Sequence, residues 1–387
     1  MPDPIYLDHA ATTPVRPEVL EAMLPYLGER FGNPSSLHRW GRQARAALDE
    51  ARERVAACFG AGPDELCFTS GGTEGDNFAI LGAWRMQRDK RPGVLTTPIE
   101  HKAILGAAHQ AAHEGADERI CRMTPDADVD VASFRELLGN DTAVASVMWL
   151  NNEVGCIQPI AQLAEMTKAT GAVFHTDAVQ AFGKVETDAR KTPFDVLSIS
   201  GHKIGAPKGY GAMYIRRGVK LEPLLHGGSQ DRGRRPGTEN VAAAVGLARA
   251  AELATAEREK ECARLSRLRD KLEAAILAAL PDAVVHGKNA SCRAPHILNV
   301  SVPGTESESM LMALDLQGIG CSAGSACQSG SVSASHVLTA IGVSPDLAGA
   351  AIRMSLGHLN DEASIARAGS VFVSLAQRAR RMAGATA

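Results

Sequence analysis

Short apolar runs alternate with Ala-rich stretches of helical periodicity along the first half of the chain. The runs are rich in aliphatic and β-branched residues and have the length of buried strands. Alternation of this kind predicts an α/β fold with a mainly parallel sheet, in which ligands bind beyond the carboxyl ends of the strands. The predicted strands are 66–70, 93–98, 144–150, 172–177, 196–200 and 211–215, and helices are predicted at 77–88, 101–114 and 160–170.

The last third of the chain has a different pattern. Residues 255–280 repeat apolar positions at spacings of three and four, which predicts one long amphipathic helix. A strand at 297–302, a helix near 308–317 and a Gly/Ser-rich segment at 320–331 follow. We therefore predict a large domain over 15–255 and a smaller α+β domain formed by 1–14 and 256–387.

Charge and cysteine content narrow the class of protein. The chain has 41 basic and 44 acidic residues, so charge gives no reason to propose nucleic acid or an anionic membrane as a partner. No apolar run approaches the roughly 18 residues that span a bilayer, and the first residues do not resemble a signal peptide. The eight cysteines include no pair with C-x-x-C spacing and no zinc-like set. Scattered thiols fit a reducing compartment, and we expect a cytoplasmic protein.

Three polar motifs each follow a predicted strand. Gly72 and Thr73 lie in a Gly-Gly-Thr turn that suits either a phosphate at a helix N-terminus or an ordinary helix cap. Asp177 ends a strand, where a carboxylate either holds a pyridinium nitrogen protonated or caps a helix. Lys203 lies in a Ser-Gly-His-Lys turn and is either a Schiff-base lysine or a surface lysine. Their order along the chain favours a pyridoxal phosphate site.

Cysteine and arginine residues near the C-terminus complete the candidate chemistry. Cys327 lies in a segment of small residues, whose composition predicts mobility and a thiol that visits two sites. By composition alone, such a cysteine is more often not a nucleophile. Ser322 falls in a G-x-S-x-G match, but a helix and not a strand is predicted before it, so a serine hydrolase is the least favoured function. Arg353 lies in an apolar run and is expected to have a carboxylate partner, from the protein or the substrate.

With these positions in place, the chain resembles cysteine desulfurases of the NifS/IscS type, in the class V aminotransferase group of fold-type I pyridoxal phosphate enzymes. The resemblance runs nearly from end to end. It implies a large domain around a mainly parallel, seven-stranded type of sheet, and a smaller α+β domain. The motifs that carry it include YLDHAATTP, FGNPSSLH, FTSGGTE, NNEVG, FHTDAVQ, SGHKIGAPKG, RRPGTEN, ILNVS, GSAC and IRMSLG.

The resemblance implies a role for each matching residue. Lys203 is implied to form the Schiff base with the cofactor, His101 to stack on its ring and handle protons, and Cys327 to accept the sulfur. Arg353, helped by Asn152, is implied to hold the substrate carboxylate. The implied cofactor-binding residues are Gly72, Thr73, Asn152, Asp177, Gln180, Ser200, Gly201, His202, Lys203 and Thr238, the last reaching the cofactor phosphate of the other subunit in a homodimer.

The implied reaction converts L-cysteine to L-alanine and leaves a persulfide on Cys327. The implied acceptor is an iron–sulfur scaffold of the NifU/IscU type, with which Cys327 would briefly share a cluster as an iron ligand. The sequences of several motifs resemble those of NifS more than those of IscS, which predicts a link to nitrogen fixation. Two alternatives stay open: a pyridoxal phosphate β-lyase or selenocysteine lyase that does not use the enzyme thiol, and a non-catalytic sulfur-carrier subunit.

The sequence departs from the commoner family pattern at several positions. Gly72 replaces a frequent Ala or Cys, and Gln328 replaces the usual Thr or Ser after the nucleophile. Neither removes a group that the reaction needs. Cys321 lies six residues before Cys327, and we expect that it can trap the persulfide as a disulfide within the segment under oxidation.

Overall fold

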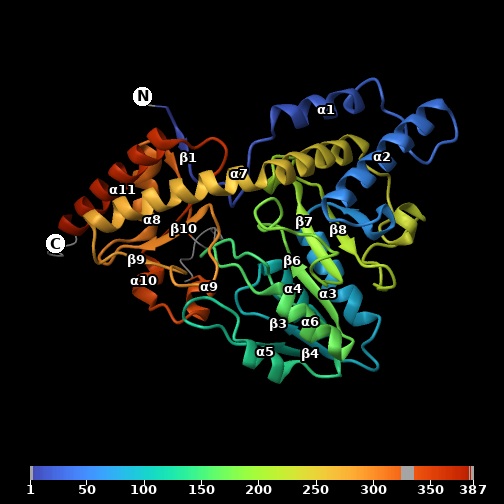
Figure 1. Cartoon of the computed structure of the whole chain (residues 1–387), viewed down its shortest axis with the longest axis horizontal. Coiled ribbons are helices and arrows are strands. Elements are labelled where there is room, and N and C mark those ends of the chain that lie inside the picture. Colours follow the sequence, from blue (N-terminus) through green and yellow to red (C-terminus); the bar gives the residue numbers. More distant parts are fainter. Residues whose placement is uncertain (1–2, 324–334, 383, 385–387) are drawn as a thin grey trace.

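A seven-stranded sheet forms the centre of the larger part of the molecule (Figure 1). The computed structural model describes residues 3–323, 335–382 and 384. All neighbouring strands are parallel except β8, which runs antiparallel to both of its neighbours. The predicted α/β class with a mainly parallel, seven-stranded sheet is thus confirmed. The strand order is β2 (Leu66–Thr69), β8 (Gly211–Ile215), β7 (Val196–Ser200), β6 (Val173–Asp177), β5 (Thr142–Ser146), β3 (Gly93–Thr96) and β4 (Asp117–Ile120).

Helices cover both faces of this sheet because side chains alternate along its strands. Val94 and Val144 pack on one face against α3 (Gly72–Arg85) and α4 (Lys102–His113). Leu95 and Ala145 point to the other face, in the largest apolar core of the protein. The helices that contribute to this second core are α1 (Pro17–Leu27), α2 (Arg39–Cys58), α5 (Val131–Leu137), α6 (Ile160–Thr170) and the first part of α7 (Val241–Ala279).

A smaller unit follows, built on a three-stranded antiparallel sheet in the order β12-β10-β9. A separate pair of short parallel strands, β1 (Ile5–Tyr6) and β11 (Ile319–Gly320), joins the start of the chain to this unit. Its elements are β9 (Val284–Val285), β10 (Ile297–Ser301), α8 (Ser307–Leu316), α9 (His336–Ala340), α10 (Pro345–Gly349), β12 (Ala351–Ser355) and α11 (Glu362–Met382).

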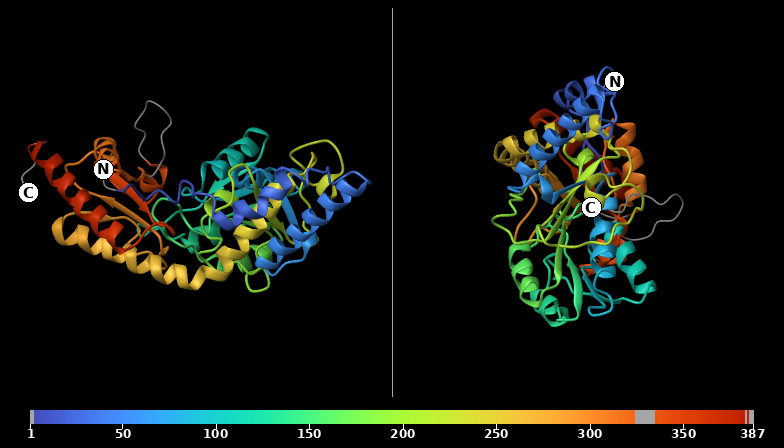
Figure 2. Two further views of the ribbon diagram at one scale, coloured as in Figure 1. Left: turned by 90° about the horizontal axis from the view of Figure 1, so that it is seen from above. Right: turned by 90° about the vertical axis from the view of Figure 1, so that its right-hand side faces the viewer.

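Helix α7 belongs to both units (Figures 1 and 2). It begins at Val241, not near residue 255 as the amphipathic pattern predicted. Its first turns, through Ala251, are buried almost all round in the large core, so they carry no amphipathic period that would reveal a helix. Its second half places Leu265, Leu268 and Leu272 in the core of the smaller unit. The division into domains 15–255 and 1–14 with 256–387 stays a prediction.

Two further differences from the expected elements have physical causes. Strand β4 was not predicted because its sequence, DERI, is mostly polar and lies at the edge of the sheet. Strand β5 ends at Ser146, earlier than expected, although residues 147–150 are still buried. Within the described part of the chain, none of the helices combines the length and apolar character needed to cross a bilayer.

Candidate active site

One cavity of about 360 Å³ lies at the carboxyl ends of the parallel strands. Its walls come from the segments that follow β2, β3, β5, β6 and β7, which meet at this edge because the strands are parallel. The smaller unit contributes a strand residue and a helix residue to the same walls. Ten of the residues singled out in the sequence line this cavity: Gly72, Thr73, His101, Asn152, Asp177, Gln180, Ser200, His202, Lys203 and Arg353.

The N-terminus of α3 forms one end of the cavity. Gly71, with a φ of 150°, makes the turn between β2 and α3, a backbone conformation that only glycine adopts readily. Gly72 and Thr73 then begin the helix, and Ser200 faces them from the end of β7. Free backbone N–H groups, the helix dipole and two hydroxyl groups together make a set of donors that fits a phosphate.

Asp177 supplies a buried acid in the middle of the cavity. It ends β6, is 3% exposed, and its Oδ1 accepts a hydrogen bond of 2.8 Å from the Val179 N–H. Burial raises the pKa of this carboxyl, while the nearby His101 and Lys203 act in the opposite direction. A buried carboxyl at this place fits the ring nitrogen of a pyridine cofactor, whose protonated form it stabilises.

Lys203 ends the 3₁₀ turn η2 (Gly201–Lys203), directly after β7. Its ammonium donates hydrogen bonds to the carbonyl oxygens of Ala10 and Ala11, at 2.6 and 2.8 Å. Burial, followed by the nearby Arg353 guanidinium, lowers the pKa of Lys203 to about 8. A larger fraction of this amine is therefore neutral near physiological pH, which is the form that attacks a carbonyl group.

His101 and Gln180 are held by the backbone around the cavity. His101 is the N-cap of α4, and its Nδ1 accepts a hydrogen bond from the Ala103 N–H. Burial lowers its pKa, so the ring is neutral with its proton on Nε2. Gln180 Nε2 donates to the Ala10 carbonyl oxygen at 2.8 Å, on the segment that also receives Lys203.

Arg353 lies on β12 and is 3% exposed. Its Nη2 donates to Asp8 Oδ1 at 2.8 Å and its Nη1 to the carbonyl oxygen of Asn152 at 3.0 Å. The expected carboxylate partner is thus present within the chain, as Asp8. The Nε group is buried and has no partner among the described residues, so the guanidinium keeps capacity for a ligand.

Three buried acids in the cavity wall were not found from the sequence: Asp76, Glu100 and Glu153. Glu100 precedes His101 and is fully buried; its Oε1 accepts from Thr97 Oγ1 and Met148 N–H, and burial raises its pKa to about 8. Asp76 lies one turn into α3, and burial together with Asp177 raises its pKa well above the usual range. The sequence offered two signals for such acids. Glu100 directly precedes the candidate His101, and Asp76 lies four positions after Gly72.

Two predicted residues lie outside the lining of this cavity, and a third falls outside the described part of the chain. Gly201 begins η2 beside Ser200 and supports the turn without lining the cavity. Thr238 lines a different hollow, with Tyr210 and Arg235, so its expected contact with another subunit's cofactor stays a prediction. Cys327 lies outside the described residues, as does the disulfide expected of it. The described Cys321 has its thiol pKa raised to about 12 by burial.

The segment that leads to Cys327 begins at the cavity wall. Ser322 pairs with Arg353 through two backbone hydrogen bonds, of 3.1 and 2.6 Å. On the far side of the undescribed residues, Ser335 Oγ donates a hydrogen bond to Glu153, which also lines the cavity. Both ends of the segment are therefore attached next to the candidate active site.

Comparison with known proteins matches the aminotransferase class-V family model to residues 5–367. The chain belongs to this family. It is 44% identical to a cysteine desulfurase IscS of Methanosarcina thermophila, over 99% of this chain and 94% of that protein. A solved NifS-like protein is 34% identical with a TM-score of 0.90, over 97% of this chain and 100% of that one. The solved structure of SspA in complex with cysteine is 32% identical with a TM-score of 0.80, over 91% and 98% of the two chains.

These findings confirm the family resemblance that the motifs indicated. Enzymes of the class-V family depend on pyridoxal phosphate, and this chain is a pyridoxal phosphate enzyme. The donors at the start of α3, the buried Asp177 and the amine of Lys203 are the groups that such a cofactor requires, and all line one cavity. The role of each residue stays a proposal.

Proposed function

We propose that this cavity converts L-cysteine to L-alanine and that Cys327 takes up the sulfur as a persulfide. The protein is a pyridoxal-phosphate-dependent cysteine desulfurase that supplies sulfur for iron–sulfur cluster assembly. The observation that carries the proposal is that Asp177, Lys203, His101 and Arg353 converge on one cavity. The related SspA, solved in complex with cysteine, supports this choice of substrate.

When bound, pyridoxal phosphate supplies an electron sink that stabilises negative charge at the substrate Cα. Gly72, Thr73, Ser200 and His202 would hold its phosphate, with Gly201 shaping the turn. Asp177 would hold the proton of the ring nitrogen, and Gln180 and Asn152 would bind the ring hydroxyl. Lys203 would attach the cofactor and His101 would lie against its ring.

The remaining roles concern the substrate. Arg353 would orient the carboxylate of L-cysteine, with its Nε and the neighbouring Asn152 as donors. The Lys203 amine, with its pKa lowered to about 8, would remove the Cα proton. His101, neutral and with its proton on Nε2, would exchange protons with the reacting sulfur groups.

Cys327 would act as the nucleophile toward the substrate sulfur. Its thiolate forms a bond to that sulfur, the carbon–sulfur bond breaks, and the bonding electrons stay on the substrate carbon, which a proton converts to the methyl group of alanine. Ser322, attached at the cavity wall, is five residues away along the chain.

Replacement of Cys327 tests the proposal. Cys327→Ala is expected to abolish persulfide and sulfide formation while the yellow colour of the bound cofactor remains. Cys292→Ala is the matched control, because Cys292 is an exposed free thiol away from the cavity. Turnover of Cys327→Ala at the wild-type rate would instead identify a β-lyase or selenocysteine lyase, and absence of bound cofactor would favour a sulfur-carrier subunit.

The proposal extends to partners and location. We propose a homodimer, because large apolar side chains are exposed along α1 and the segment that follows it. Thr238 would then serve the cofactor of the other subunit. The proposed acceptor is a NifU/IscU-type scaffold in the cytoplasm, with Cys327 as a transient iron ligand and a dedicated role in nitrogen fixation. The exposed apolar residues are Leu20, Leu24, Leu27, Phe31, Leu37 and Trp40.

A further inference from the structure

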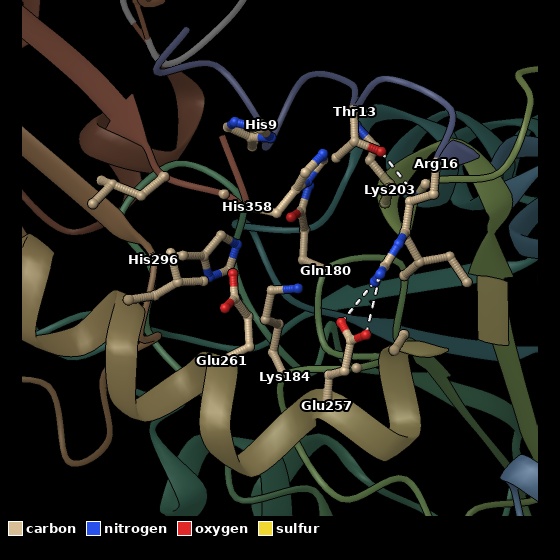
Figure 3. Close-up of a pocket in the computed structure, with 17 residues that line it drawn as sticks. His9, Thr13, Arg16, Gln180, Lys184, Lys203, Glu257, Glu261, His296 and His358 are labelled. Atoms are coloured by element: carbon tan, nitrogen blue, oxygen red, sulfur yellow. Dashed lines mark hydrogen bonds and ion pairs between the residues drawn. The ribbon is translucent and has the colours of Figure 1, made fainter. Parts of the chain in front are cut away.

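A second cavity, of about 130 Å³, adjoins the candidate active site and is lined in part by Lys203 (Figure 3). Lys203 and Gln180 line both cavities, so these two side chains form the wall between them. The second cavity has room for several water molecules or for a ligand of a few heavy atoms. Its walls come from the start of the chain, from the segments that follow β6 and β7, from α7, and from the residues just before β10 and just after β12.

Two histidines in this cavity have polar atoms without partners. His9 is 5% exposed, and neither of its ring nitrogens has a hydrogen-bond partner among the described residues. His296 is 3% exposed, and its Nδ1 is likewise unpartnered in that part of the chain. A buried polar atom without a partner destabilises the folded state. The chain thus leaves donors and acceptors unsatisfied around one common space.

Lys184 brings a positive charge to the same space (Figure 3). Burial lowers the pKa of its ammonium, while the nearby Glu261 acts in the opposite direction. Its charge acts on both His9 and His296, whose pKa values it lowers further. One cation and two imidazoles therefore line one cavity, and Glu261 is the carboxylate of this cavity whose charge acts on Lys184.

The carboxylates of this cavity are already neutralised by arginines. Glu257 accepts hydrogen bonds from Arg16 at 2.6 and 3.1 Å, and Glu261 accepts from Arg264 at 2.7 and 2.8 Å. Neither forms an ion pair with Lys184 within 4.0 Å. The Lys184 ammonium thus has no direct ion pair with either carboxylate, although the charge of Glu261 acts on it. In the described residues, no group of histidine, cysteine and carboxylate side chains has the arrangement of a metal site.

We propose that this cavity is a binding site for a small monovalent oxyanion, held by the Lys184 ammonium and by N–H groups of His9 and His296. A neutral imidazole donates one hydrogen bond, and an ammonium donates up to three. A planar oxyanion accepts from all of them and removes both the unpaired charge and the unsatisfied nitrogens. The ligand is either an organic carboxylate or an inorganic anion of the same shape. The inference is independent of the proposed function.

The test is a calorimetric titration of the cofactor-loaded protein with sodium formate, acetate and nitrate, in a zwitterionic buffer without added salt. The Arg353→Gln background removes the guanidinium of the active site as a competing anion site. We expect saturable binding that Lys184→Gln weakens by at least about tenfold, the usual loss for a hydrogen-bonded charge. Lys191→Gln, at an exposed lysine paired with Glu186, is the matched control and is expected to bind as the background does.

A second variant guards against misfolding of Lys184→Gln. His9→Phe keeps a ring in place but removes both nitrogens, and it is expected to weaken binding by about threefold or more. Acetate binding as tight as formate binding would assign the site to organic carboxylates, and a preference for nitrate and formate would assign it to compact inorganic anions. Absence of binding by all three anions, or an unchanged dissociation constant in both variants, would overturn the proposal.

Discussion

Arg353 donates a hydrogen bond to Asp8 at 2.8 Å, across 345 positions of the sequence. The two residues join β12 to the segment that follows β1, at the wall of the active-site cavity. A carboxylate therefore already occupies one side of the guanidinium that we propose for the substrate. The substrate carboxylate must share Arg353 with Asp8 or displace it.

We expect Asp8→Asn to lower the KM for L-cysteine. The Asp8 carboxylate has the same charge as the substrate carboxylate, at a partly exposed site. Its removal favours substrate binding by roughly 1 kcal/mol, which corresponds to an about fivefold lower KM. Arg353→Gln is expected to raise KM instead, because it removes the proposed carboxylate partner. Steady-state kinetics with Asp3→Asn, an exposed position, as control would check both directions; an increased KM in Asp8→Asn would show that Asp8 only positions Arg353.

Glu100 is expected to make stability depend on pH. Its pKa of about 8 in the folded protein is above the unfolded value of about 4.3, so folding binds a proton here. The stability that this proton contributes is complete below the pKa of Glu100 in the unfolded chain, and it is lost as the pH rises through the pKa of Glu100 in the folded protein. Glu100→Gln has no such proton to lose, so its stability relative to wild type should rise by roughly 2–4 kcal/mol between about pH 5 and pH 9.

Thermal unfolding midpoints of both proteins across this pH range measure the effect. Glu259→Gln, on the exposed side of α7, is the surface control. A constant difference between Glu100→Gln and wild type would mean that Glu100 is already ionised in the folded protein.

The lowered pKa of Lys203 predicts its chemical reactivity in the cofactor-free protein. Only the neutral amine reacts with acylating reagents, so labelling of Lys203 should rise with a midpoint near pH 8. Arg353→Gln should shift the midpoint upward, because a nearby positive charge no longer disfavours the ammonium. Mass spectrometry of the labelled peptide, with Arg381→Gln as an exposed control, provides the measurement. A midpoint near the ordinary lysine value of about 10.4 would contradict the burial argument.

Gly72 is expected to be required because of its neighbour Val179. A Cβ added at residue 72 would lie 2.7 Å from Val179 Cγ2, closer than two carbon atoms approach. Gly72→Ala should therefore weaken pyridoxal phosphate binding by about tenfold, and the added change Val179→Ala should restore it. Cofactor titration of the apoprotein tests this pair, with Gly106→Ala as control, since nothing lies within 4 Å of a Cβ there. Equal losses in the single and double variants would place the cause elsewhere.

The sequence predicts the parts of the fold that local patterns encode. Strands β7 and β8 and helix α6 have the predicted bounds, since each is a short apolar or periodic run between clear breaks. The predicted start of α7 was wrong because full burial of its first turns removes the periodicity that marks a helix. Polar edge strand β4 was missed because it buries little apolar surface.

The sequence pointed to cavity-lining residues where they end or follow a strand and belong to a motif, as Asp177 and Lys203 do. It failed for residues that acquire their character from burial alone, such as Glu100 and Asp76. It also gave no sign of the second cavity. His9, Lys184 and His296 are far apart in sequence, and only the packing of the two units brings them together.

Helix α7 has a consequence for how substrate enters the protein. Its 39 residues run without interruption from the core of one unit into the core of the other. A hinge motion that separates the two units would break backbone hydrogen bonds near the middle of α7 and expose buried side chains on both halves of the helix. We therefore expect the two halves to move as a single rigid frame. Admission of cysteine and departure of alanine then depend on rearrangements at the rim of the cavity rather than on domain closure.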